Sequence, residues 1–280
     1  ATRLVSRGFD DAIKLWDLPG LQVSHVLKGT ARTGKSLLLS HDDAWVACSG
    51  QRIVEETAVA DIRLWSAATG SEEASVTLPS EAPRATLCAR PSIRALAMSP
   101  CSDVLAASLL TGEVLLWKVP GLRRLGSLRP PDLQRCMLRC PLAFSPDGKI
   151  LARGSDGWRL YLWDLRREEA PREVRLPHDA FGPIAFCPDG RHLAVANASE
   201  ITVLDVISGQ VAMTLAGHRS RVRALTPCPE CGLLASAAGD GVRVWQLSPT
   251  EPGGASLWPM SGPVATPTAI EPAVGAITTA

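Results

Sequence analysis

The sequence predicts an all-β fold made of six similar antiparallel sheets, and one repeated phrase is the main reason. An aliphatic residue, a variable residue, a second aliphatic residue and then usually tryptophan recur six times. The final positions of the six copies are Trp16, Trp65, Trp117, Trp163, Leu204 and Trp245. A recurrence every 41 to 52 residues indicates an array of like structural units.

Each phrase is predicted to be a strand because its aliphatic positions alternate with period two. A second apolar element lies upstream, as at residues 104–107 and 233–236, and before it a first strand ends in a turn such as residues 145–148. Pro, Asp and Gly favour the backbone angles of such turns. A fourth strand follows each phrase. Each unit is therefore predicted to be a four-stranded meander whose two apolar faces are covered by radial stacking.

Length and charge exclude several classes of protein. The 280-residue chain is long enough to bury most of its apolar surface. Its formal net charge of +1 argues against a strongly basic nucleic-acid domain or an acidic tail. No run of about 18 apolar residues occurs, so we expect no membrane-spanning helix. The sequence begins without Met or a signal peptide, and we expect it to be a segment of a longer protein.

The order of these elements resembles the WD-repeat family of β-propellers over residues 1–248. The family motif stands here as Trp16-Asp17, Trp163-Asp164 and Gly217-His218. The resemblance implies a hydrogen-bonded set of His, Ser or Thr, Asp and Trp in a blade. The last blade offers His218, Ser236, Asp240 and Trp245, and the first offers Ser6, Asp10 and Trp16 without a His. The other blades depart from the pattern, so the structural tryptophans Trp65, Trp117 and Trp163 are expected to act mainly through packing.

Both ends of the chain are predicted to contribute to one ring. The chain opens inside a unit, with a second strand at residues 4–6 and a third at residues 12–16. Residues 273–280 resemble a first strand that would complete this blade. Residues 249–272 are rich in Pro and Ala and are predicted to be a loop, with an outer strand at residues 256–258. This arrangement closes a ring of six blades, and a seven-bladed ring cut at the chain ends is the alternative.

Residues 29–36 match the phosphate-loop pattern G-x-x-x-x-G-K-S in full. In such a loop backbone amides hold phosphates, Lys35 would reach the β and γ oxygens and Ser36 would bind Mg²⁺. That mechanism needs a helix after the loop, whereas residues 37–46 predict a strand, an Asp-Asp turn and a second strand. We therefore favour a junction between blades and keep nucleotide binding as the alternative.

Cysteines and histidines predict no catalytic or metal site. The eight cysteines are sparse and irregular, which favours buried reduced thiols of a cytoplasmic or nuclear protein over a disulfide framework. Cys228-x-x-Cys231 lacks the second pair of ligands that a tetrahedral zinc site needs. No Ser/His/Asp set or carboxylate pair stands out from the turn residues. We therefore expect no catalytic residue, no cofactor and no metal.

Basic residues gather in the loops that join the fourth strand of one unit to the first strand of the next. In a β-propeller these loops share one face, called here the top face. They span residues 28–35, 79–92, 129–139, 177–182 and 216–221, and they hold ten Lys and Arg residues against three acidic residues. Such a ring would favour an acidic partner, and solvated arginines paired with neighbouring acidic loops are the alternative.

The candidate partner-binding residues are arginines and aromatic residues on or near this face, because such side chains often dominate binding. They are Arg32, Arg52, Trp158, Phe181, Arg219 and Arg221. Arg52 lies in residues 51–60, which lengthen the connection between the second and third strands of the second blade. Long loops on rigid scaffolds often carry recognition, although an insertion without function would cost little stability.

Together these features predict a non-catalytic scaffold that binds proteins or peptides on its loop faces, as the WD-repeat resemblance implies. We expect it to be cytoplasmic or nuclear, to form part of a larger protein or assembly, and not to bind membranes. A basic top face that binds nucleic acid or a phosphorylated ligand is an alternative, and so is nucleotide binding at residues 29–36.

Overall fold

A computed structural model describes residues 2–8, 10, 12–18, 20–27, 36–54, 57–78, 92–131, 140–155, 158–167, 169–177, 182–228 and 232–246, without the side chains of residues 52–58. All the regular elements in these ranges are strands, and they form six antiparallel sheets. Within this part of the chain there is no helix of the length and apolar character needed to cross a bilayer.

The six sheets follow one another in chain order, and we call them blades 1 to 6. Blade 1 contains β1 (Arg3–Arg7), β2 (Ile13–Asp17) and β3 (Gln22–Leu27). Blade 2 contains β4 (Leu37–Leu39), β5 (Trp45–Val54), β6 (Thr57–Ser66) and β7 (Glu72–Leu78). Blade 3 contains β8 (Ile93–Met98), β9 (Val104–Leu109), β10 (Val114–Lys118) and β11 (Arg123–Leu128).

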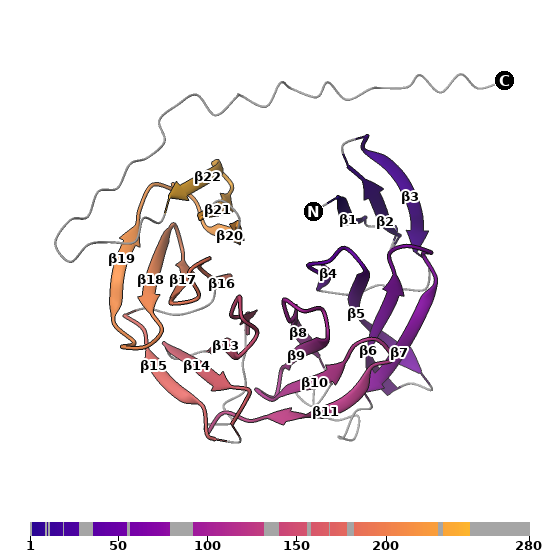
Figure 1. The fold of residues 1–280 in the computed structure, drawn as a ribbon, viewed down its shortest axis with the longest axis horizontal. Coiled ribbons are helices and arrows are strands. Elements are labelled where there is room, and N and C mark those ends of the chain that lie inside the picture. Colours follow the sequence, from indigo (N-terminus) through magenta and orange to yellow (C-terminus); the bar gives the residue numbers. More distant parts are fainter. Residues whose placement is uncertain are drawn as a thin grey trace.

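Blade 4 contains β12 (Leu142–Phe144), β13 (Ile150–Ser155), β14 (Arg159–Asp164) and β15 (Arg172–Arg175). Blade 5 contains β16 (Ile184–Phe186), β17 (His192–Asn197), β18 (Glu200–Asp205) and β19 (Val211–Leu215). Blade 6 contains β20 (Val222–Cys228), β21 (Leu233–Ala238) and β22 (Gly241–Gln246). Figure 1 shows the blades around a common centre, which confirms the predicted six blades of a β-propeller.

The segment at residues 51–60 corrects one expectation. Gln51 pairs with Ala60 and Val54 with Thr57, so both ends of this segment continue the ladder between β5 and β6. The expected long loop is therefore for the most part an extension of a hairpin. The β-branched residues in this segment explain the result, because they favour extended backbone.

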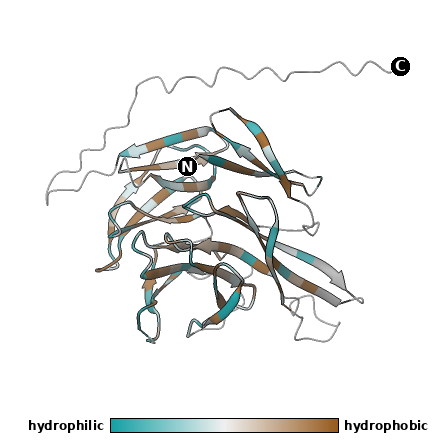
Figure 2. Cartoon of the chain, turned by 45° about the vertical axis from the view of Figure 1, so that its right-hand side comes forward, coloured by the Kyte–Doolittle hydropathy of each residue, from teal (hydrophilic) through white to brown (hydrophobic). Residues whose placement is uncertain are grey.

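The hydrophobic core lies between the blades. On β6, Ile62 and Leu64 share a cluster with Trp117 of blade 3. Trp65, the next residue, points to the other side and shares a cluster with Leu15 of blade 1. Figure 2 shows hydrophobic and hydrophilic residues alternating along the strands. One repeated phrase therefore supplies apolar side chains to both neighbours of its blade.

The same alternation recurs in later blades. Leu116 of blade 3 packs with the cluster that holds Trp163 of blade 4, and Leu162 packs with Leu204 of blade 5. Leu204 is 2% exposed, so leucine fills the position of the missing tryptophan. Burying each such side chain stabilises the fold by about 1.5–3 kcal/mol.

The outermost faces of blades 1 and 6 depart from this rule. Val242 and Val244 occupy the aliphatic positions of the sixth phrase, yet they are 62% and 44% exposed. In blade 1, Leu4 and Val26 are each 48% exposed on the side away from blade 2. Figure 1 shows these two blades on either side of an opening in the ring. The closing strand at residues 273–280, the loop at 249–272 and the seven-bladed alternative lie outside the described residues and stay predictions.

The turns between the first and second strands are held by carboxylates. Ser145 Oγ donates to Asp147 Oδ1 at 2.6 Å, and the Lys149 backbone N–H donates to the same oxygen at 3.1 Å. These bonds, led by that of Ser145, lower the pKa of Asp147 to about 2. In blade 3, hydrogen bonds from Lys118 and then Ser99 lower the pKa of Asp103. The turn residues predicted from the sequence therefore form charged links in the fold.

Ring closure by the C-terminal segment can be tested with two isoleucines. Ile277→Asp would place a carboxylate in the predicted closing strand and is expected to lower the melting temperature by roughly 4 °C or more. Ile270→Asp lies in the predicted loop and is expected to leave it unchanged. Calorimetry of both variants measures the difference, and equal melting temperatures would refute the closing strand.

The turn carboxylates predict an acid-sensitive fold. The pKa of Asp147 is lower in the folded chain than its ordinary value of 3.8, so its charged form stabilises the fold above about pH 4. This stabilisation is lost as the pH falls from about 4 towards 2. Urea unfolding should therefore show the largest stability gap between wild type and Asp147→Asn near neutral pH, closing near pH 2. A gap independent of pH would contradict this account.

Candidate functional site

The top face is built from two kinds of connection in the described residues. One kind joins an outer strand to the next inner strand, as between β19 and β20. The other joins the second and third strands of a blade, as between β21 and β22. Because neighbouring strands are antiparallel, both kinds lie at the same end of the blades. Arg219, Arg221 and Trp158 are the predicted contact residues whose side chains the structure describes there.

A chain of four side chains lies beneath this face in blade 6. Trp245 Nε1 donates to Ser236 Oγ at 2.8 Å, and this oxygen lies 2.7 Å from His218 Nε2. His218 Nδ1 lies 2.9 Å from Asp240 Oδ1. A carboxylate can only accept, so Nδ1 carries the proton and Nε2 accepts from the Ser236 hydroxyl. The structure thus brings together the four residues predicted for this blade.

Asp240 connects the buried chain to the loop above it. Asp240 Oδ2 accepts from the Arg219 backbone N–H at 2.9 Å, and Ser220 Oγ donates to Oδ1 at 3.2 Å. The Arg219 amide, followed by His218, holds the pKa of Asp240 well below its usual range. The loop backbone is therefore fixed, while the side chains of Arg219 and Arg221 are exposed.

Blade 1 holds a shorter version of this chain. Trp16 Nε1 donates to Ser6 Oγ at 2.7 Å, as the sequence predicts. Asp10 Oδ1 accepts from the Ala12 backbone N–H at 3.3 Å and so supports the turn between β1 and β2. In blades 2 to 4 the corresponding tryptophans Trp65, Trp117 and Trp163 are 1 to 3% exposed in apolar clusters.

Trp158 is a large aromatic side chain presented to solvent. It precedes β14 on the top face and is 55% exposed. Its φ of 64° lies in the left-handed region, which is costly for a bulky residue. Its carbonyl accepts a hydrogen bond from Leu176 N–H at 2.8 Å, which anchors the backbone to the loop after β15. A strained, anchored and exposed tryptophan is suited to contact a partner.

The other candidate contacts are not placed. Arg32 and Phe181 lie outside the described residues. Arg52 lies on β5, where its backbone pairs with Val59, but its side chain is not described. Of the ten basic residues of the predicted ring, the structure describes Arg129, Arg219 and Arg221. Arg129 is paired with Glu113 at 3.1 Å, as the alternative of solvated, paired arginines predicts.

The segment after the phosphate-loop pattern is a strand. Residues 28–35 lie outside the described residues, and β4 begins directly after Ser36. Ser36 exchanges backbone and side-chain hydrogen bonds with Ser49 of β5. Asp43 then adopts a positive φ of 57° in the turn before β5. The predicted strand, turn and strand are confirmed, so a helix does not follow this loop as phosphate binding would require.

The cysteines correct another expectation. Cys140 and Cys228 each take part in a disulfide bond, so the prediction of reduced thiols is wrong for these two. Burial raises the pKa of Cys48 to about 11 and that of Cys187 to about 12, which keeps these thiols protonated and unreactive. The described residues contain no cluster of His, Cys, Asp and Glu that could hold a metal.

Sequence reasoning missed a groove between blades 3 and 4, on the face of β11. Gly126 in the middle of this outer strand was the available signal, because the matching position in blade 2 is Ala74 and that in blade 5 is Met213. A glycine where related strands carry side chains leaves unfilled space.

Comparison with known proteins agrees with the repeats. The family model described as "WD domain, G-beta repeat" matches residues 142–164 and 209–246. An uncharacterized WD repeat-containing protein of Synechocystis, sll1491, is 31% identical over 107 residues, which cover 38% of this chain and 31% of that protein. COMPASS component SWD1 of Saccharomyces cerevisiae is 29% identical over 138 residues, which cover 47% of this chain and 32% of that protein.

A third relative is the transcriptional corepressor LEUNIG_HOMOLOG of Arabidopsis thaliana. It is 28% identical over 106 residues, which cover 38% of this chain and 13% of that protein. The chain therefore matches about a third or less of the length of these three relatives. The repeated phrase, the six sheets and the matched family model agree: residues 142–164 and 209–246 match the WD-repeat family, and the chain resembles the WD-repeat β-propellers.

Proposed function

We propose that this chain is a non-catalytic scaffold that binds an acidic segment of a partner protein on its top face. The observation that carries the proposal is Trp158, a 55% exposed tryptophan on an anchored backbone. Tryptophan and arginine side chains supply much of the binding energy of protein interfaces. Arg32, Arg52 and Phe181 stay predicted contacts of the same site.

Arg219 and Arg221 supply the charge for this proposal. Their loop is fixed through Asp240, so ordering its backbone on binding would cost little conformational entropy. Exposed arginines on a near-neutral protein raise the local positive potential and speed encounter with an acidic partner.

The relatives support a role in protein assemblies. Two of them carry the names COMPASS component and transcriptional corepressor. For this chain we propose membership of a protein complex in the nucleus or cytoplasm, without naming the complex. Nucleotide binding at residues 29–36 is disfavoured because a strand follows the loop.

The proposal is tested by pull-down with the chain and three variants. Trp158→Ala and the double variant Arg219→Glu/Arg221→Glu are expected to lose captured proteins, with affinities at least about tenfold weaker. The control Lys149→Glu reverses an exposed charge in the turn between β12 and β13, at the opposite end of blade 4, and should retain them.

Nuclease treatment of the pull-down distinguishes binding to a protein from the alternative of binding to nucleic acid. Capture that survives nuclease and is lost with the top-face variants supports the scaffold. Capture abolished by nuclease would favour nucleic-acid binding, and capture unaffected by both sets of substitutions would place the binding site elsewhere.

A further inference from the structure

A groove lies between the outer strand of blade 3 and the turn after β14 in blade 4. Its volume is about 660 Å³, within the range of ligand-binding clefts. Blade 3 contributes Val104, Leu116 and Leu128 to its lining, and blade 4 contributes Trp163 and Leu165. We call it the β11 groove. Its apolar lining offers a dry surface to one or two apolar side chains.

Gly126 is the reason that this space is open. It pairs with Leu116, the aliphatic residue that precedes the tryptophan of the phrase. At the same place blade 2 has Ala74, blade 4 has Arg172 and blade 5 has Met213. A Cβ added at Gly126 would meet no atom within 4 Å, and its φ is not in the left-handed region. The backbone does not require glycine here, so the missing side chain leaves room for an outside group.

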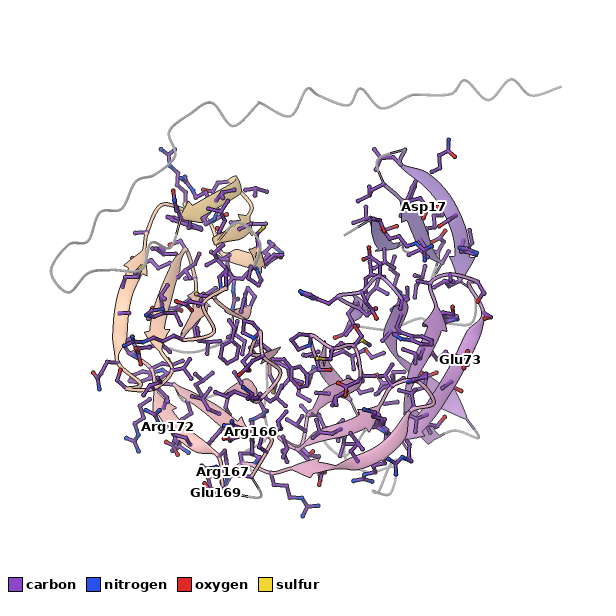
Figure 3. All side chains as sticks on the ribbon, in the orientation of Figure 1. Asp17, Glu73, Arg166, Arg167, Glu169 and Arg172 are labelled. Carbon is purple, nitrogen blue, oxygen red and sulfur yellow. The ribbon has the colours of Figure 1, made fainter. Side chains whose placement is uncertain are left out.

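Charged residues line the groove and lie beside it. Arg129 and Arg167 line it together with Asp164 and Glu169. Arg123 at the start of β11 and Arg166 after β14 are arginines next to this lining, and Glu113 is the partner of Arg129. Figure 3 shows Arg166, Arg167 and Glu169 together on blade 4.

The acidic residues of this region already have arginine partners. Asp164 is held by Arg166 at 2.6 Å, Glu113 by Arg129 at 3.1 Å, and Glu169 lies 3.6 Å from Arg167. Arg123 is exposed and pairs with Lys118, two residues from Leu116, so its side chain lies on the same side of β11 as Gly126. It has no ion-pair partner among the residues that the structure describes. The region therefore has an excess of positive charge.

We infer that the β11 groove binds an extended segment of a partner protein, with an apolar side chain over Gly126 and acidic residues beside Arg123. The outer edge of β11 is unpaired within its sheet, so its backbone groups can hydrogen-bond to an added strand. The apolar lining and the positive rim select an acidic segment with an apolar anchor. This second binding surface is separate from the top face.

The test fills the groove without straining the fold. Random twelve-residue peptides displayed on phage are selected on the Trp158→Ala/Arg219→Glu/Arg221→Glu chain, which removes binders of the top face, and the affinities of the enriched peptides are then measured for the wild-type chain and each variant. Gly126→Leu should weaken binding at least tenfold and leave the melting temperature unchanged, because the added atoms enter open space. Arg123→Glu should also weaken binding.

Two controls separate this surface from others. Thr214→Leu places the same side chain on the exposed outer strand of blade 5 and should not change affinity. Arg219→Glu/Arg221→Glu should leave these peptides bound, since they do not use the top face. Peptides that bind Gly126→Leu as tightly as wild type, or that lack acidic residues, would overturn the inference.

Sedimentation velocity of wild type and Gly126→Leu tests whether the groove binds a second copy of this chain instead. A monomer in both cases supports a partner segment. A wild-type dimer that Gly126→Leu dissociates would show that the groove binds a second copy of this chain, and would overturn the inference.

Discussion

The packing of each blade against the next is the interaction on which this structure depends. A four-stranded sheet with two apolar faces cannot exclude water from both by itself. The third strand solves this by sending Leu64 forward to blade 3 and Trp65 back to blade 1. Because each core is shared, stability is a sum over neighbouring interfaces, and the outer faces of the described end blades expose the residues that inner blades bury. Val242 shows this directly.

Polar contacts within a blade also hold a surface loop in place. In the middle blades buried tryptophans or Leu204 fill the shared cores. In blade 6 the chain from Trp245 to Asp240 also reaches the Arg219 backbone and so fixes a surface loop. The same carboxylate therefore links the interior of the blade to the face proposed to bind a partner. Its low pKa follows from these hydrogen bonds.

Both proposed binding surfaces arise where a regular blade has one unusual residue. Trp158 occupies a left-handed turn position and is exposed on the top face. Gly126 lacks the side chain that fills the corresponding position in other blades. The surrounding sheets hold both sites in place, so a partner need not order them. The chain could engage two segments at once, because the two surfaces lie on different parts of the propeller.

The sequence alone determined the strands, their order and the turn residues, because these follow from period-two alternation and local turn chemistry. It also identified His218, Ser236, Asp240 and Trp245 as one set through a family resemblance. Only the tertiary structure decided that residues 51–60 extend a hairpin, that Cys140 and Cys228 each take part in a disulfide bond and that Gly126 opens a groove. The physical reason is that alternation shows which residues share a face of a strand, whereas burial, bonding and open space depend on what the neighbouring blade places opposite that face.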